Sequence, residues 1–396
     1  MELELWWLLV IPLFFALGWL ASRIDARHLI RQSSQLPDAY FKGLNFLLNE
    51  QPDKAIDAFV DVVKLDPETV ELHFALGNLF RRRGETDRAI RVHQSLVSRS
   101  DLQPAQREHA LFELGQDFLR AGLLDRAEDA FNRLEGSSYA GAALRHRLDL
   151  AQMVRDWPRA IELAQRLQRD AGEDLRHLIA HFHCELAQQA LAGSAPDRHE
   201  QARREIDRAL VSGGAHPRPW LLRGEAAFAA DDFDAAIDAW SELARISAPH
   251  LALTGERWLQ AHEHVGRLDA GLLRLEAALA EHPSVDALRA IAQARARRDG
   301  APAAIAWLRE SLSRNPSLLG LEQLIELRKA GGETDAAASD IALAGALIQK
   351  QAARLSRFVC GQCGFKARRF YWQCPGCNHW DSYPPRRTEA LEADGG

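Results

Sequence analysis

A pattern of small and bulky residues recurs along this chain at a spacing close to 34 residues. The marks of the first unit are Ala39, Gly43, Phe46, Ala55, Phe59 and Pro67. Those of the second unit are Leu76, Gly77, Phe80, Gly84, Ala89 and Leu96. After a short insertion, the third set is Leu114, Gly115, Phe118, Gly122, Ala127, Phe131 and Leu134. Antiparallel helices pack closely where a small residue meets a bulky one, so the pattern predicts stacked helical pairs.

The offsets match the tetratricopeptide pattern, and later units keep it more faintly. A sixth unit is marked by Trp220, Gly224, Ala236, Trp240 and Leu243. The marks of the seventh are Trp258, Gly266, Gly271, Leu275 and Pro283, and those of the eighth are Ala287, Ala304, Leu308 and Pro316. A last pair, over 318–327 and 334–355, lacks the marks and is interpreted as a cap. We predict a tetratricopeptide-like solenoid of about nine helical pairs over residues 36–356.

The composition agrees with a helical body. Alanine, leucine, arginine and glutamate dominate, and alternating stretches rich in Ile, Val and Thr are almost absent. The net charge of −6 gives no overall bias toward nucleic acid. The sequence contains no nucleophile elbow, phosphate-binding loop, dinucleotide fingerprint or kinase signature. We therefore predict an all-α protein that is not an enzyme and has no catalytic or cofactor-binding residues.

The amino terminus carries an uncharged apolar stretch, residues 5–22, with tryptophans near both ends. As a helix it spans about 27 Å, enough for the hydrocarbon core of a bilayer. Glutamates precede it and arginines follow from Arg23 onward, so the positive-inside rule places residues 1–4 outside and the rest in the cytoplasm. We predict a transmembrane helix over 5–22 and a juxtamembrane segment over 23–35. A cleaved signal peptide and a buried helix of a soluble protein are the alternatives.

Two C-x2-C pairs near the end of the chain predict a metal site formed by Cys360, Cys363, Cys374 and Cys377. A tight turn aims both sulfurs of such a pair at one point, so two pairs complete a tetrahedral thiolate site. We expect one structural ion, zinc by default. Iron in a rubredoxin-like site uses the same thiolates, and the sequence does not separate the two. Two structural disulfides are the alternative, which a cytoplasmic location disfavours.

We assign residues 357–385 to a rubredoxin-like metal module. Between its cysteine pairs, Phe365–Gln373 predicts a short hairpin that supplies an apolar cover. Because Phe358 follows the cap helix almost directly, we expect the module to buttress the last helical pair. Residues 386–396 are expected to form a disordered tail. The basic residues of this region are Arg354, Arg357, Lys366, Arg368, Arg369, Arg386 and Arg387. They fit a solvated face, docking onto the array or an acidic partner, or a nucleic-acid surface.

Two histidine-rich stretches do not predict further metal sites. His181, His183 and Cys184 lie one to three positions apart on a helix, and neighbours one or two apart do not share a helix face. A single buried thiol is common in helical proteins. His262 and His264 lack the H-E-x-x-H spacing that places two histidines one helical turn apart.

The order of these parts resembles the lipopolysaccharide assembly protein B family, from residue 1 to about Pro385. The most specific match is the run Cys-Gly-Gln-Cys-Gly-Phe from Cys360, followed by Tyr-Trp-Gln-Cys-Pro-Gly-Cys ending at Cys377. The tail beyond Pro385 is not required by the family pattern. The resemblance implies a regulator of lipopolysaccharide synthesis in the inner membrane of Gram-negative bacteria. Residues 1–4 would then be periplasmic, and the array and metal module cytoplasmic.

The resemblance also implies partners. The family acts as an adaptor that brings the deacetylase committing precursor to lipid A, LpxC, to the membrane-bound AAA+ protease FtsH. An inner-membrane anti-adaptor protein is implied to bind the transmembrane segment, and the metal module to pack on the repeats rather than react. Self-association is a further expectation, while a nucleic-acid partner is not expected. Electron transfer by an iron-loaded site and nucleic-acid binding by a tethered ribbon remain the alternative functions.

Overall fold

The computed structural model describes residues 42–43, 45–46, 48–49, 51–65, 69–213, 215–330, 345–351 and 357–388. The chain divides between Val154 and Arg155 into two compact units. The predicted transmembrane helix, its two flanking segments and residues 389–396 of the predicted tail lie outside the described residues. Of the helices in the described ranges, none combines the length and the hydropathy needed to cross a membrane.

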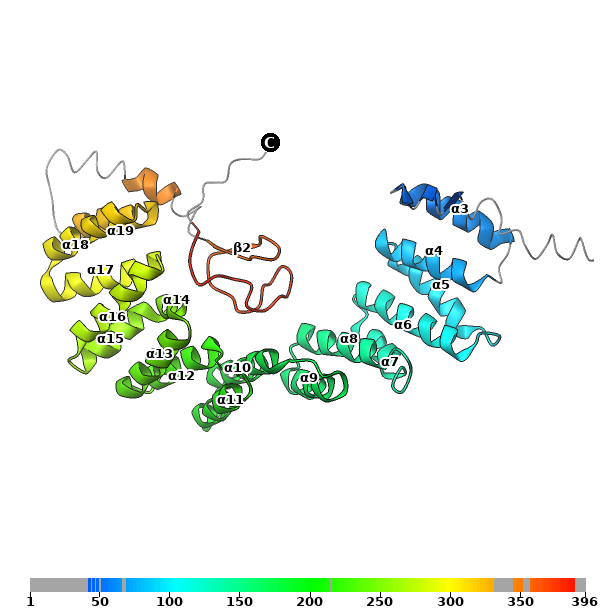
Figure 1. The fold of residues 1–396 in the computed structure, drawn as a ribbon, viewed down its shortest axis with the longest axis horizontal. Helices are drawn as coiled ribbons and strands as arrows, with labels where there is room; N and C mark the ends of the chain where they lie inside the picture. Colours follow the sequence, from blue (N-terminus) through cyan, green and yellow to red (C-terminus); the bar gives the residue numbers. More distant parts are fainter. Residues whose placement is uncertain are drawn as a thin grey trace, which may run out of the picture. The chain divides into compact units, whose positions relative to one another are not determined.

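The first unit consists of helices that pack on their neighbours in chain order (Figure 1). They are α3 (Pro52–Leu65), α4 (Val70–Arg82), α5 (Thr86–Ser98), α6 (Pro104–Arg120), α7 (Leu124–Asn132) and α8 (Ala140–Met153). The pairs α4–α5 and α6–α7 coincide with the second and third predicted repeats. The repeat register that we read from the sequence is therefore confirmed here.

The second unit continues the helical pairs and ends in a small β-containing module. Its first helices are α9 (Trp157–Ala171), α10 (Arg176–Ala192), α11 (Arg198–Gly213), α12 (Pro217–Ala229) and α13 (Phe233–Ile246). They are followed by α14 (Ala248–Leu251), η1 (Ala252–Thr254), α15 (Gly255–His264), α16 (Leu268–Glu281), α17 (Val285–Asp299), α18 (Ala301–Arg314) and α19 (Leu318–Ala330). Residues 345–351 are also helical. The pairs α12–α13, α15–α16 and α17–α18 correspond to the sixth, seventh and eighth predicted repeats.

Within the pairs, a glycine of one helix lies against a large ring of the other. Phe131 packs over Gly115, and Trp240 packs over Gly224. A Cβ atom added at Gly224 would lie 2.2 Å from Nε1 of Trp240, so this ring occupies the space of the missing side chain. Trp240 is fully buried and its indole N–H donates to the carbonyl of Leu221 at 3.3 Å. The close approach of the helices therefore depends on glycine at this position.

A buried polar network in the first unit replaces one of these apolar contacts. His93 occupies the ring position over Gly77 and is fully buried. Its Nδ1 lies 2.5 Å from Asp117, and Arg81 bonds the same carboxylate at 2.9 Å and Glu113 at 2.5 Å. Burial alone raises the pKa of Glu113, but hydrogen bonds from His109 and Arg81 outweigh it and bring the pKa to about 2. The network joins α4, α5 and α6.

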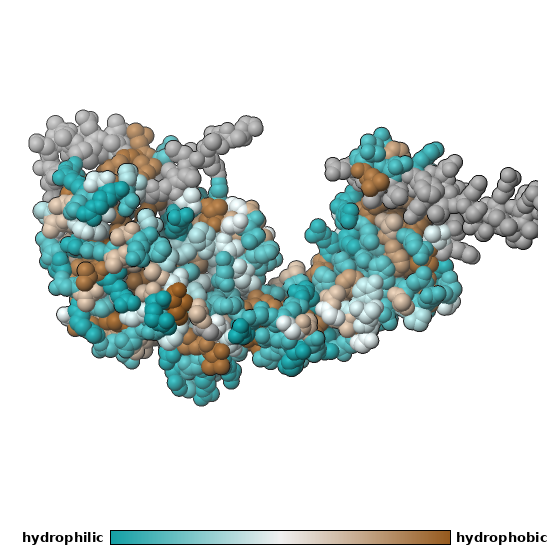
Figure 2. All heavy atoms as spheres, in the orientation of Figure 1, coloured by the Kyte–Doolittle hydropathy of each residue, from teal (hydrophilic) through white to brown (hydrophobic). Residues whose placement is uncertain are grey.

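The surface of both units is mostly hydrophilic on the face shown in Figure 2, with hydrophobic residues scattered over it. Exposed large apolar side chains include Leu48, Met153, Val154, Val211 and Leu273. Scattered apolar residues are normal on a soluble surface, so they do not by themselves define a binding site.

We expect Gly224→Ala to lower the free energy of unfolding by about 1–3 kcal/mol, because the added methyl group forces Trp240 and its helix outward. The matched control is Gly141→Ala in α8, where a Cβ atom meets nothing within 4 Å. This control is expected to leave stability unchanged or to raise it by up to about 1 kcal/mol. Chemical denaturation of the full chain in detergent, followed by circular dichroism, measures both. Equal stability of the two variants would contradict the packing argument.

Candidate metal centre

The metal module begins with a short antiparallel ladder that holds the first cysteine pair. Strand β1 (Phe358–Val359) pairs with β2 (Lys366–Ala367), with Phe358 opposite Ala367. Cys360 and Cys363 lie in the turn between these strands. The predicted hairpin over Phe365–Gln373 is therefore wrong. Strand β2 pairs with β1, which precedes it across the first cysteine turn, and not with a strand that follows it. The hydrogen bonds between β1 and β2 close this turn and pair the backbone N–H and C=O groups next to the cysteines.

The two cysteine turns have the same backbone geometry. The N–H of Cys360 donates to the carbonyl five residues on at 3.0 Å, and the N–H of Cys374 does so at 2.8 Å. Each first-cysteine carbonyl accepts from the residue four positions on, Gly364 or Asn378. These two residues have positive φ angles of 73° and 60°, which glycine and asparagine adopt most readily. The repetition shows that each C-x2-C segment forms the same thiolate-presenting turn.

The four sulfurs converge with distances that fit a tetrahedral metal ion. The Sγ atoms of Cys360 and Cys377 are 3.8 Å apart, and those of Cys363 and Cys374 are 3.7 Å apart. All four sulfurs lie within 4.8 Å of one another, and the cysteines are free rather than disulfide-bonded. Metal–sulfur bonds of about 2.3 Å give a tetrahedron with edges of about 3.8 Å. The donor set therefore fits a structural metal ion, and zinc and iron fit it equally.

Backbone donors and aromatic rings support this sulfur cluster. The N–H of Gln362 points at Sγ of Cys360 and that of Gly376 at Sγ of Cys374, both at 3.4 Å. Such bonds favour the thiolate form that binds metal. The predicted apolar cover is made largely by Phe358, Phe370 and Tyr383, whose rings meet edge to face. Cys360 and Cys374 are buried, whereas Cys363 is exposed.

The module docks on the repeat helices through two tryptophans. Trp380 stacks on His181 of α10 with ring centroids 4.4 Å apart. Trp372 stacks on His250 of α14 at 5.2 Å with an interplanar angle of 4°. The guanidinium of Arg218 in α12 lies 5.6–5.8 Å from both indole rings. Cation–π contacts and stacking between half-buried rings each contribute about 0.5–2 kcal/mol.

A hydrogen-bonded cluster, which we call the Asp381 latch, fixes the same interface. It consists of Asp381 in the module and of His181, His216 and Arg218 in the array. Nε2 of His181 lies 2.8 Å from a carboxylate oxygen of Asp381, and Nε2 of His216 lies 3.6 Å from the same oxygen. The two Nε2 atoms are 3.0 Å apart, so both face one oxygen.

Arg218 determines which nitrogen of each latch histidine carries the proton. Its Nη1 lies 3.1 Å from Nδ1 of His181, and its backbone N–H donates to Nδ1 of His216 at 3.2 Å. Because both Nδ1 atoms accept hydrogen bonds, the proton of each neutral ring is on Nε2. A metal ion would need unprotonated Nε2 atoms. Although its three potential ligand atoms lie within 4.8 Å of one another, we interpret the cluster as a latch and not as a second metal site.

Burial keeps two histidines of the interface, His181 and His250, in the neutral form. Burial lowers the pKa of His181 to about 3 and that of His250 to about 4. Burial alone raises the pKa of Asp381, but hydrogen bonds from His181 and His216 outweigh it and hold that pKa well below its usual range. The docked state therefore combines an ionised Asp381 with uncharged imidazoles at His181 and His250.

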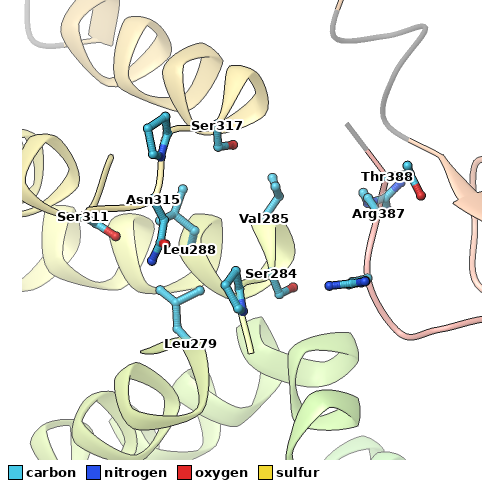
Figure 3. A pocket seen from close by; sticks show the side chains of 12 residues that line it. Leu279, Ser284, Val285, Leu288, Ser311, Asn315, Ser317, Arg387 and Thr388 are labelled. Atoms are coloured by element: carbon cyan, nitrogen blue, oxygen red, sulfur yellow. The ribbon is translucent and has the colours of Figure 1, made fainter. Parts of the chain in front are cut away.

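A second anchor ties the end of the module to α17. Arg387 bonds both carboxylate oxygens of Asp286 at 3.0 Å, and Thr388 donates its N–H to the carbonyl of Arg357. Figure 3 shows Arg387 and Thr388 across a hollow of about 320 Å³ from Leu288 and its neighbours. The ordered module thus extends through Thr388, three residues beyond the expected boundary.

The docking position involves helices far from the module in the chain. In the described part of the chain, the module contacts α9, α10, α12, α14, η1 and α17. The second helix of the expected last pair lies mostly outside the described residues, so support of that pair by the module stays a prediction. The feature of the sequence that belongs to this interface is the histidine-rich run at His181.

The remaining candidate residues have structural roles. Cys184 is fully buried, and burial raises the pKa of its thiol to about 12. His183 contacts Glu205 at 2.7 Å and does not join the latch. His262 packs on Trp258, while His264 stacks on a different ring. Of the first stretch, His181 belongs to the latch through its contact with Asp381.

The fold and its site define a class of protein, a tetratricopeptide-repeat array with a docked four-cysteine ribbon. A family model described as a rubredoxin metal binding domain matches residues 358–384, and a tetratricopeptide-repeat model matches residues 42–104 and 258–318. The chain is 33% identical to lipopolysaccharide assembly protein B of Escherichia coli (strain K12), over 96% of this chain and 97% of that protein. The chain therefore belongs to the lipopolysaccharide assembly protein B family.

More distant similarities add little. The protein of the same name from Haemophilus influenzae is 28% identical, over 95% of this chain and 97% of that protein. Among solved structures, the chain is similar to the APC/C hetero-tetramer Cut9–Hcn1, with 16% identity and a TM-score of 0.31 over 70% of this chain and 52% of that one. We draw no conclusion from a structural likeness of this size.

Replacing Cys363 and Cys374 by serine together is expected to abolish metal binding, because it removes one sulfur from each turn. Cys184→Ala is the matched control and should retain one ion per chain, since this buried thiol lies outside the cluster. Elemental analysis of the purified full-length proteins gives the metal content. Retention of a full equivalent of metal by the double variant would contradict the proposed ligand set.

We expect acidification to weaken docking of the module. His181 and His250 are neutral when docked, whereas a freed ring takes up a proton below its ordinary pKa of 6.5. The equilibrium constant for docking is therefore highest above pH 6.5. Below that pH it falls by roughly tenfold per histidine for each pH unit. Hydrogen exchange in the segment around Trp380, from pH 7.5 to about 5, measures docking. Metal content in the same samples separates undocking from metal loss, and pH-independent protection would contradict the prediction.

Proposed function

We propose that this chain is a membrane-tethered adaptor of lipopolysaccharide synthesis, which brings the deacetylase LpxC to the protease FtsH for degradation. The observation that carries the proposal is the family match over 96% of the chain, which includes both the repeats and the ribbon. The relatives are named assembly proteins, and repeats of this kind bind other proteins. Both points favour a scaffold without enzymatic activity.

We propose that residues 5–22 anchor the chain in the inner membrane, with residues 1–4 in the periplasm. The uncharged stretch and the arginines after it support this topology. Tethering raises the effective concentration of the array near membrane partners. An anti-adaptor protein in the same membrane would bind this segment. Self-association of the anchored array is compatible with this arrangement.

In this proposal Cys360, Cys363, Cys374 and Cys377 hold one structural ion, most simply zinc. Four protein ligands leave no position for a substrate or a reactive water. The ion stabilises a module too small to fold around an apolar core of its own. Its role is therefore to hold the docking tryptophans and Asp381 in place.

Purification of the full chain from its native membranes tests the adaptor function. We expect FtsH and the deacetylase to co-purify, and depletion of the chain to lengthen the half-life of the deacetylase. A variant without residues 1–22 is expected to fold but to lose regulation in cells. If neither enzyme is captured and the half-life of the deacetylase does not change, the proposal fails.

Electron transfer is the second candidate function, because exposed Cys363 places one edge of the cluster at the surface. It requires iron, which gives a coloured protein with iron in place of zinc. A colourless protein with one zinc per chain excludes it.

A further inference from the structure

A cleft of about 570 Å³ lies between the metal module and the repeat helices of the second unit. Its repeat side comes from α10, α12, η1, α15 and α17, and its other side includes Phe370 and Trp372 of the module. Volumes of about 300–1,000 Å³ are typical of sites for small ligands or short segments. Because the module forms one wall, the cleft exists only while the module is docked.

Among the described residues, two arginines of this cleft form no close ion pair. Arg289 enters from α17 and Arg369 from the module, so each wall supplies one. Arg369 donates to the hydroxyl of Tyr371 at 2.6 Å. Neither arginine has a carboxylate at ion-pair distance among the residues that the structure describes, and Glu322 of α19 interacts with Arg289 at longer range. Arginines that converge without a partner are suited to bind a carboxylate or phosphate.

The other charges of the wall limit what can bind. Arg257 bonds Glu225 at 3.0 Å and Arg387 bonds Asp286 at 3.0 Å, so both pairs are already formed. Glu256 adds another carboxylate to the wall. These three carboxylates repel a polyanion such as a nucleic acid, whereas a single carboxylate can lie between the two unpaired arginines. The charge pattern favours an acidic peptide segment.

A buried hydroxyl in the cleft lacks a partner. Thr254 in η1 lines the cleft and is 3% exposed, yet its Oγ1 has no hydrogen-bond partner. An unsatisfied buried hydroxyl destabilises the free protein, and a ligand that bonds it would remove that cost. Half-buried Leu253, Phe370 and Trp372 supply apolar surface in the same cleft. This combination suits a peptide with backbone polar groups and an apolar side chain.

We propose that this cleft binds an extended acidic segment of a partner protein. Its carboxylate would lie between Arg289 and Arg369, a backbone group would bond Thr254, and an apolar side chain would cover Phe370 and Trp372. The proposal deepens the adaptor function and rests on it. The proposal also links the metal ion to partner binding. Loss of the ion would release the module from the array and so remove one wall of the cleft.

The first test replaces both unpaired arginines, Arg289→Gln with Arg369→Gln, in the full-length chain. We expect capture of the deacetylase or of the protease to fall roughly tenfold or more, because hydrogen bonds to charged groups are lost. Arg120→Gln with Arg309→Gln is the control, since both are exposed and outside the cleft. It removes the same charge and should leave capture unchanged. Undiminished capture by the cleft variant, or an equal loss in the control, overturns the proposal.

Thr254→Val separates a binding role from a structural one. Removing an unpartnered buried hydroxyl while keeping the shape should raise the thermal stability of the free chain. The same change should weaken capture. A variant that is less stable, or that captures its partner as well as the original chain, shows that the hydroxyl does not serve binding.

A photo-crosslinking amino acid at Gln293, in the wall of the cleft, identifies the occupant in intact membranes. We expect a crosslink to a segment of a co-purifying protein that contains Asp or Glu, and its loss in the double arginine variant. A crosslink to nucleic acid, to lipid, to residues 389–396 of this chain or to a segment without acidic residues overturns the proposal. If neither the deacetylase nor FtsH is captured but an acidic segment of another protein is crosslinked, the adaptor function fails and the cleft assignment stands.

Discussion

The hydrogen bond between Asp381 and His181 is the contact on which the arrangement of the second unit depends. It joins residues 200 positions apart and places a charged group of the module against buried imidazoles of the array. Arg218 makes this contact specific, because its donors fix the proton of both histidines on the nitrogen that faces Asp381. Hydrogen bonds weaken steeply when donor and acceptor leave their preferred distance and angle. The latch therefore selects one docking position among the many that stacked aromatic rings alone would allow.

The metal centre acts through this interface. A module of this size buries too little apolar surface to fold alone, so thiolate–metal bonds and contact with the array must together hold its shape. The two cysteine turns position the chain that carries Trp372, Trp380 and Asp381. A site without an open coordination position can therefore still matter for function, because it determines whether the cleft beside the module has its second wall.

The first unit shows how a repeat tolerates a departure from its pattern. His93 stands where other repeats have Phe131 or Trp240, and it brings a polar ring into the interior. Asp117 bonds Nδ1 of that ring and also Arg81, so hydrogen bonds replace part of the apolar contact. Removing one member of such a network would leave a buried charge without a partner, which is costly. A polar residue at a ring position of a repeat is thus accompanied here by a charged residue on a neighbouring helix that bonds it.

The sequence by itself determined the helical pairs and the cysteine tetrad, because both depend on local spacing. A glycine and a large ring about sixteen positions later meet whenever the pair forms, as Gly224 and Trp240 do, and two residues between cysteines fix a turn. Only the tertiary structure decided where the module docks and what it encloses. His181 carries no spacing signal that points to Asp381, and Arg289 and Arg369 become neighbours of one cleft only after docking. The physical reason is that this interface depends on buried area and hydrogen-bond complementarity between distant segments, which no periodicity of the chain encodes.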